Sequence, residues 1–144
     1  MTNLALVARK LAVMDEHLRR LTERRPPAMA ILLADTLLQD AMSMSILVVV
    51  QEAMDIALHI ASDEGWELAS TYRESFVVLA RHGVIASDLV ASLGASAQLR
   101  NRITHGYASL DVERLWHDLP TGMASFAEFS RAIAAFLQRQ LAGS

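Results

Sequence analysis

Hydrophobic positions at the start of the chain recur with the period of a helix. From Asn3 to Arg24, apolar residues follow one another at intervals of three or four, at Leu4, Val7, Leu11, Met14, Leu18 and Leu21. Such spacing places them on one helical face, so we predict an amphipathic helix over this stretch. Pro26 and Pro27 should end it, because proline disfavours helical geometry in the residue that precedes it.

A longer and more apolar segment runs from Ala28 to Ala61 without proline or glycine. It predicts a single helix about 50 Å long. Its longest uncharged stretch, Ala41 to Gln51, is shorter than the roughly 20 apolar residues that a membrane span needs, and acidic residues interrupt the remainder at Asp35, Asp40, Glu52 and Asp55. We therefore expect no membrane contact. An apolar helix of this kind is typical of burial on two sides, against the core and against a partner subunit.

Turn and capping signals divide the middle of the chain into further helices. The run Ser62 to Gly65 is a stop signal. Thr71 and Glu74 have the form of a capping box, which predicts a helix that ends near Gly83. The next apolar pattern predicts a helix from Leu89 to Gly106.

Two more helices are predicted at the C-terminal end. Asp111 can cap a short helix that ends at Asp118, and Pro120 or Ser125 then opens a last helix to about Leu141. No segment alternates as a strand would. The sequence thus predicts an all-α bundle of four to six helices with short connections, forming a single domain over residues 1–144.

Composition narrows the chemistry open to this bundle. The chain has no cysteine and a net charge of −3. It therefore has no disulfide and no thiolate metal site, and because its start lacks a signal-peptide pattern we expect a cytoplasmic protein. An acidic chain is a poor non-specific binder of nucleic acid, so any RNA contact must come from a local basic patch.

Residues 99–107 gather polar side chains at one helix end, reading Leu-Arg-Asn-Arg-Ile-Thr-His-Gly-Tyr. Leu99 and Ile103 are four positions apart and can face the core together. His105 falls in the last helical turn, and histidine is the side chain best suited to acid–base catalysis near neutral pH. The stretch is therefore a candidate catalytic site.

The spacing of Arg100 and His105 leaves two interpretations open. Five residues correspond to about 140° around a regular helix, so the two side chains do not share a face. They converge only through the reach of the arginine or through a second copy across a dimer axis. In the structural alternative, His105 caps its helix and Arg100 pairs with a carboxylate.

The same stretch resembles the R-x4-H-x-Y signature of the HepT toxins, a branch of the HEPN superfamily. The signature positions are matched by Arg100, His105 and Tyr107, and the polar residue that often follows the arginine by Asn101. The resemblance extends over about residues 32–137, through the helix around Gln51 and the downstream Asp111 and Trp116. R-x4-H alone is a weak signal, but in this setting the combination is specific.

The resemblance implies a HEPN-type bundle that acts as a homodimer and cleaves RNA without a metal or other cofactor. Arg100, His105 and Asn101 would be catalytic, and Arg102 would contact RNA phosphate. The implied partner is a minimal nucleotidyltransferase, the MNT antitoxin, which would neutralise the toxin by transferring AMP to Tyr107. Arginine would stabilise the charged phosphorane, and Asn101 would orient His105 or the phosphate.

A metal site elsewhere is the weaker interpretation of a second polar cluster. Glu52, Asp55 and His59 fall on one helical face, but a ferritin-like site needs Glu-x-x-His on two helices, which the chain lacks. A polar stripe beside a dimer cleft, or an Asp55–His59 pair, explains them better.

Two other function classes stay open besides an RNase toxin. One is a catalytically silent HEPN module that docks a nucleotidyltransferase or binds nucleotide, which the negative net charge favours. The other is a plain helical scaffold, in which Arg100 and His105 would lie far from any cleft.

Overall fold

The computed structural model describes residues 1–105 and 111–143, and within them it contains six helices and no strand. The helices are α1 (Leu4–Arg24), α2 (Met29–Ala34), α3 (Thr36–Asp63), α4 (Tyr72–Arg81), α5 (Leu89–His105) and α6 (Val112–Ala142). The expected all-α bundle is thereby confirmed.

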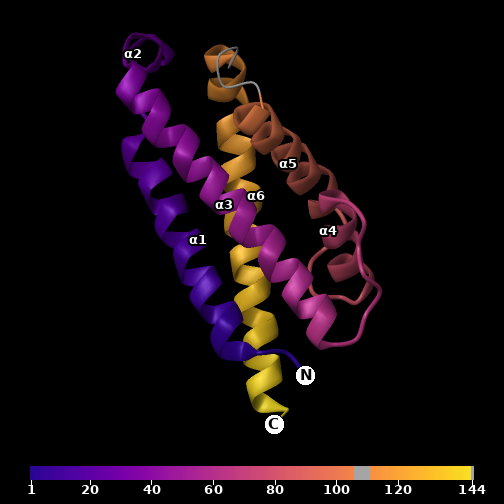
Figure 1. Ribbon diagram of the computed structural model, residues 1–144. Coiled ribbons are helices and arrows are strands. Elements are labelled where there is room, and N and C mark those ends of the chain that lie inside the picture. The colour runs from indigo at the N-terminus through magenta and orange to yellow at the C-terminus, as the bar shows by residue number, and fades with distance from the viewer. Residues whose placement is uncertain (106–110, 144) are drawn as a thin grey trace.

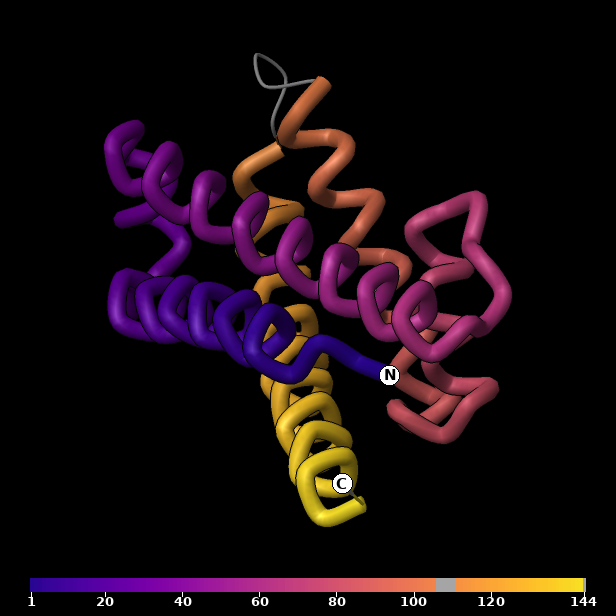
Figure 2. Tube along the Cα trace, turned by 60° about the horizontal axis from the view of Figure 1, so that its bottom comes forward, coloured from indigo at the N-terminus to yellow at the C-terminus, as the bar shows by residue number. Residues whose placement is uncertain are grey.

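The central helix is α3, which has neighbours on both sides. α1 lies alongside it and runs in the opposite direction, whereas α4 and α5 lie on its other side (Figure 1). The turned view shows α6 crossing steeply against α1 and α3 (Figure 2). α5 rises toward the end of the bundle at which α3 and α6 begin. The C-terminal turns of α5 therefore lie at that end of the molecule.

Side-chain caps fix the predicted starts of α1 and α4. Asn3 Oδ1 accepts a hydrogen bond from the Leu6 N–H at 3.1 Å. Thr71 Oγ1 accepts one from the Glu74 N–H at 3.1 Å, and the Glu74 carboxylate accepts from the Ser70 N–H at 3.0 Å. These bonds satisfy amides that have no partner inside their own helix.

The predicted single helix over Ala28–Ala61 was wrong, because the chain breaks at Asp35. This residue is extended, with φ −125° and ψ 95°, and its Oδ1 accepts from the Leu38 N–H at 3.0 Å as the N-cap of α3. Gln39 Nε2 donates to the Leu32 carbonyl at 2.9 Å and so satisfies the end of α2. Short polar side chains compete with the helical backbone in this way without any proline or glycine.

The predicted break near Pro120 was also wrong, since α6 continues through it as one helix of 31 residues. Pro120 is exposed, so the carbonyl that loses its helical donor can be solvated. An interior proline costs about 3 kcal/mol. The uninterrupted helix buries an apolar face that offsets this cost, each large side chain contributing roughly 1.5–3 kcal/mol; the face is formed by Leu115, Leu119, Phe126, Phe129, Ile133 and Phe136.

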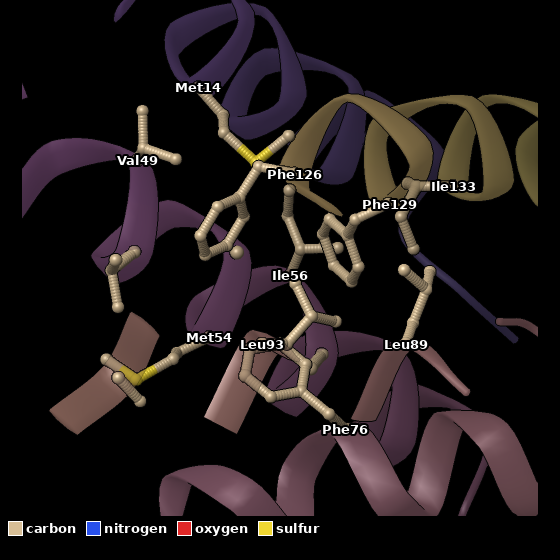
Figure 3. Packing of buried hydrophobic residues seen from close by; sticks show 14 of the residues in the cluster. Met14, Val49, Met54, Ile56, Phe76, Leu89, Leu93, Phe126, Phe129 and Ile133 are labelled. Atoms are coloured by element: carbon tan, nitrogen blue, oxygen red, sulfur yellow. The ribbon is translucent and has the colours of Figure 1, made fainter. Parts of the chain in front are cut away.

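The core draws buried side chains from all six helices. At its centre, Phe76 of α4 meets Phe129 of α6 edge to face, with ring centroids 5.8 Å apart at 83°. Met14, Ile56 and Leu93 bring α1, α3 and α5 to the same cluster (Figure 3). The core thereby fixes α5, the helix that carries the candidate site, against its neighbours.

One face of α3 leaves apolar side chains uncovered. Leu37, Met44 and Leu58 are 80%, 57% and 37% exposed. Together with Gln51 they follow one another at intervals of seven residues, at positions 37, 44, 51 and 58, so they share one helical face. By length and composition this helix could cross a membrane, but 56% of its most apolar window is buried inside the bundle, as in a core helix.

Candidate active site

The last turns of α5 present the candidate motif on a regular helix. Ile103 is 1% exposed and packs in the core, and Leu99 packs against the core from the same face. Thr104 Oγ1 donates to the Arg100 carbonyl at 2.9 Å, a bond that stays within the helix. Because Leu99 and Ile103 point inward, the polar residues between them are turned toward α3, α4 and solvent.

The Arg100 guanidinium is held by neutral groups from three helices. Its Nη2 donates to Gln51 Oε1 of α3 at 3.1 Å, and its Nη1 donates to Asn101 Oδ1 at 3.3 Å. Its Cζ lies 5.7 Å from the ring centroid of Tyr72, the first residue of α4. Cation–π contact at this distance is attractive but leaves the charge intact. Arg100 is therefore fixed in place without being neutralised.

The alternative in which Arg100 pairs with a carboxylate is not what the structure shows. Across residues 1–105 and 111–143, no ion pair joins Arg100 to an aspartate or glutamate. Asn101 Oδ1 accepts from the neighbouring Arg100, and the expectation that Asn101 orients His105 or the phosphate stays a prediction.

His105 is exposed at the C-terminal end of α5, and Arg102 is half-buried one turn earlier. No hydrogen bond in the described part of the chain links His105 to Arg100. Because the helix is regular through residue 105, the two side chains remain about 140° apart around it and about 7.5 Å apart along it. One protomer therefore presents the arginine toward α3 and the histidine toward solvent.

Tyr107, together with Gly106, lies outside the described residues, so its expected role as the acceptor of AMP stays a prediction. Beside the motif, a groove of about 390 Å³ separates the start of α4 from the middle of α5. Tyr72, Arg73, Gln98 and Asn101 line it. It brings an aromatic ring, a cation and two amides next to Arg100.

Gln51 and Tyr72 are the contacts of Arg100 that sequence reasoning missed. Gln51 lies 49 residues upstream of Arg100. In the sequence, Tyr72 is notable only because it lies between Thr71 and Glu74 of the capping box. The sequence holds one signal for Gln51, which is a polar residue directly after the apolar run from Ile46 to Val50 on the central helix.

The second polar cluster, around Glu52 and Asp55, is organised by a lysine. Lys10 Nζ lies 3.3 Å from Asp55 Oδ2 and 3.6 Å from Glu52 Oε2, with these side chains one fifth to one third exposed. In place of the suggested Asp55–His59 pair, Asp55 accepts hydrogen bonds from Lys10 and Gln51. In the portion of the chain that is described, no group of three or more His, Asp or Glu side chains is arranged to hold a metal ion.

Two of the basic residues at the end of α1, Arg19 and Arg20, form ion pairs with glutamates of the same helix. Arg19 bonds to Glu16 and Glu23, and Arg20 bonds to Glu16. The hydrogen bond from Arg19 is the main reason why the pKa of Glu16 falls to about 2. Arg25 lies over the Trp116 ring at 4.4 Å. Arg19 and Arg20 are thus paired within their own helix, whereas Arg100 has no acidic partner among the residues that the structure describes.

Comparisons with known proteins agree on one family. The family model described as "Ribonuclease HepT-like" matches residues 14–133. The chain is 28% identical over 101 residues to the mRNA nuclease HepT of Shewanella oneidensis, an alignment that covers 70% of this chain and 76% of that relative. It is 26% identical over 89 residues to the tRNA nuclease HepT of Aphanizomenon flos-aquae, covering 62% of this chain and 60% of that relative.

A solved structure shows the same fold. It is a tri-AMPylated HEPN toxin of Shewanella oneidensis in complex with an MNT antitoxin. It superposes with a TM-score of 0.82 at 24% identity, covering 94% of this chain and 99% of that one. The expected HEPN-type bundle is thereby confirmed.

Proposed function

The chain belongs to the HepT-like ribonuclease family, and from that premise we propose that it is the endoribonuclease toxin of a HEPN–MNT toxin–antitoxin pair. The observation that carries the proposal is the state of Arg100. It is held by Gln51, Asn101 and Tyr72, none of which cancels its charge. A fixed guanidinium with free donors is suited to a phosphodiester.

RNA can be cleaved with its own 2′-OH as the nucleophile. The 2′-oxygen attacks phosphorus, the bond from phosphorus to the 5′-oxygen breaks, and the products are a 2′,3′-cyclic phosphate and a 5′-OH. A base must take the 2′-OH proton and an acid must supply one to the leaving oxygen. His105 suits both roles, and Arg100 stabilises the doubly charged phosphorane through donors placed in advance. The reaction needs no metal.

The site is completed by a second copy of the chain. Arg100 and His105 point in different directions from one α5, so one protomer does not close a site around a single phosphate. The uncovered face of α3 passes directly beside Arg100 through Gln51. A twofold dimer built on this face brings two Gln51–Arg100 pairs together. One His105 then acts as base and its symmetric mate as acid, and Arg102 adds a contact to neighbouring phosphate.

Neutralisation is assigned to Tyr107. Its hydroxyl attacks the α-phosphorus of ATP bound to the MNT partner, pyrophosphate leaves, and AMP stays on the tyrosine. The added phosphate repels RNA and competes for Arg100. This part rests on the sequence signature and on the related HEPN toxin that is tri-AMPylated in complex with its antitoxin. Mass spectrometry after incubation with the cognate transferase and ATP tests it: AMP should appear on wild type and not on Tyr107→Phe. The toxin would act on cellular RNA and its partner would use ATP, which fits a cytoplasmic location.

The decisive experiment compares RNA cleavage by wild type, Arg100→Ala and His105→Ala with chelator present. Each variant should lose at least about a hundredfold in rate, as for loss of a transition-state donor or of an acid–base group. Arg139→Ala and His82→Ala are matched controls at exposed positions outside the site and should cleave normally. Full activity in either test variant would overturn the assignment. RNA that binds but stays intact with wild type would indicate a silent binding module instead.

A further inference from the structure

We infer that Gln51 and Asp55 are positioning residues that hold the Arg100 guanidinium in its working orientation. The inference rests on the proposed function for its effect on cleavage, but the positioning itself can be measured without RNA. Four side chains from three helices form one chain of polar contacts, from Lys10 of α1 through Asp55 and Gln51 of α3 to Arg100 of α5. α3 lies between the other two helices, so the contacts cross the bundle (Figure 1).

Asp55 determines which way the Gln51 amide points. A carboxylate only accepts hydrogen bonds. Asp55 Oδ1 accepts from Gln51 Nε2 at 3.0 Å, and Asp55 Oδ2 accepts from Lys10 Nζ at 3.3 Å. With its NH2 group committed to Asp55, Gln51 must turn its carbonyl oxygen the other way. That oxygen receives Arg100 Nη2 at 3.1 Å, and the reversed amide would place two donors against each other.

The neutral amide separates the arginine from the acidic side chains of α3. Asp55 is four residues from Gln51, on the same helical face, and its charge is met by Lys10 instead of Arg100. Glu52 is also beside Lys10. A carboxylate at position 51 would bind the guanidinium more strongly, but it would compete with an incoming phosphate. A glutamine holds the group through one bond and leaves its remaining N–H donors free.

The positioning is tested by the mobility of the Arg100 side chain in solution. The Nε–Hε signal of Arg100, identified by its absence in Arg100→Lys, is followed by heteronuclear NMR relaxation. Gln51→Leu should make this group several-fold more mobile. Gln138→Leu, the same exchange at an exposed position on α6, should not. An unchanged Arg100 signal in Gln51→Leu would refute the inference whatever the enzyme does with RNA.

Cleavage kinetics supply the second readout. Gln51→Leu should lower kcat/KM by roughly tenfold to a hundredfold, the range for a misplaced catalytic group. Gln51→Glu should raise KM in particular, because the new carboxylate competes with substrate phosphate. Sedimentation must show that both variants assemble as wild type does, since Gln51 lies on the proposed dimer face. Wild-type kinetics in Gln51→Leu would contradict the inference, whereas inactive Arg100→Ala and His105→Ala would still uphold the proposed function.

Asp55 is tested by a rescue that a purely structural role would not give. In Asp55→Asn, the single side-chain oxygen is drawn to the Lys10 cation, so the new NH2 group faces Gln51 and reverses its amide. Cleavage should fall by roughly tenfold. Adding Lys10→Met frees the asparagine oxygen to accept from Gln51, and most of the lost rate should return. A double variant no faster than Asp55→Asn would overturn the role of Asp55.

Discussion

Ile103 offers a direct test of whether the packing of α5 governs the motif. Its side chain is 1% exposed, and it lies three residues from Arg100 and two from His105. Ile103→Ala removes three buried carbons, worth about 2.4 kcal/mol at about 0.8 kcal/mol each. The cavity left behind adds to this, so the expected loss of unfolding free energy is about 2–5 kcal/mol. A domain with roughly 5–15 kcal/mol of stability should remain folded.

Leu93→Ala is the matched control for this substitution. Leu93 is fully buried on the same helix, and its truncation also removes three carbons. It lies seven residues before Arg100, about 10 Å along the helix axis. Both variants should lose similar free energy in urea unfolding followed by circular dichroism, with the melting temperature falling by roughly 10 °C.

The two variants should differ in RNA cleavage, measured at a temperature where both are folded. Ile103→Ala loosens the turn that carries both motif side chains, so its rate should fall roughly tenfold or more. Leu93→Ala should stay within about threefold of wild type, because the last turns of α5 keep their packing. Equal losses in the two variants, or normal cleavage by Ile103→Ala, would refute the reasoning.

Three further predictions address the dimer, the pH dependence and a helix cap. Met44→Asp places a carboxylate twice in the proposed twofold interface and should weaken the dimer roughly a hundredfold or more in sedimentation velocity; an unchanged dimer would show that α3 is not the contact. Burial, with a smaller effect of the Arg20 charge, lowers the pKa of His17 from 6.5. The unfolded chain then binds the proton more readily, so stability should fall as the pH drops below about 6.5. Urea unfolding of His17→Gln should lack this slope, and a slope equal to that of wild type would contradict the assignment. Thr71→Ala removes the cap bond to the Glu74 N–H and should cost about 1 kcal/mol of unfolding free energy, with Thr71→Ser close to wild type; equal stability in the alanine variant would deny the cap a role.

The sequence predicted those helices whose ends carry a local signal. α1, α4 and α5 begin and end close to their expected bounds, because periodic apolar residues and caps act over one or two turns. The two errors, at Asp35 and Pro120, arose where local and tertiary preferences compete. At Asp35 a side chain displaced the helical backbone, and at Pro120 a long buried face overrode a residue that favours a break.

The motif residues could be found from the sequence, but their surroundings could not. Arg100 and His105 are only five residues apart, so their R-x4-H spacing is evident in the sequence. The bond from Arg100 to Gln51 joins residues 49 positions apart, and it depends on how α3 and α5 rotate against each other in the core. No periodicity encodes that rotation, so only the three-dimensional structure shows that Arg100 has no acidic partner among the described residues.

The neutral surroundings of Arg100 have a practical consequence for handling the protein. Because Arg100 has no acidic partner in the described part of the chain, we expect its guanidinium to bind small oxyanions from the solvent. Citrate, inorganic phosphate and free nucleotides should therefore occupy it in proportion to their concentration. RNA cleavage should therefore be slower in buffers that contain high concentrations of these ions than in buffers that lack them.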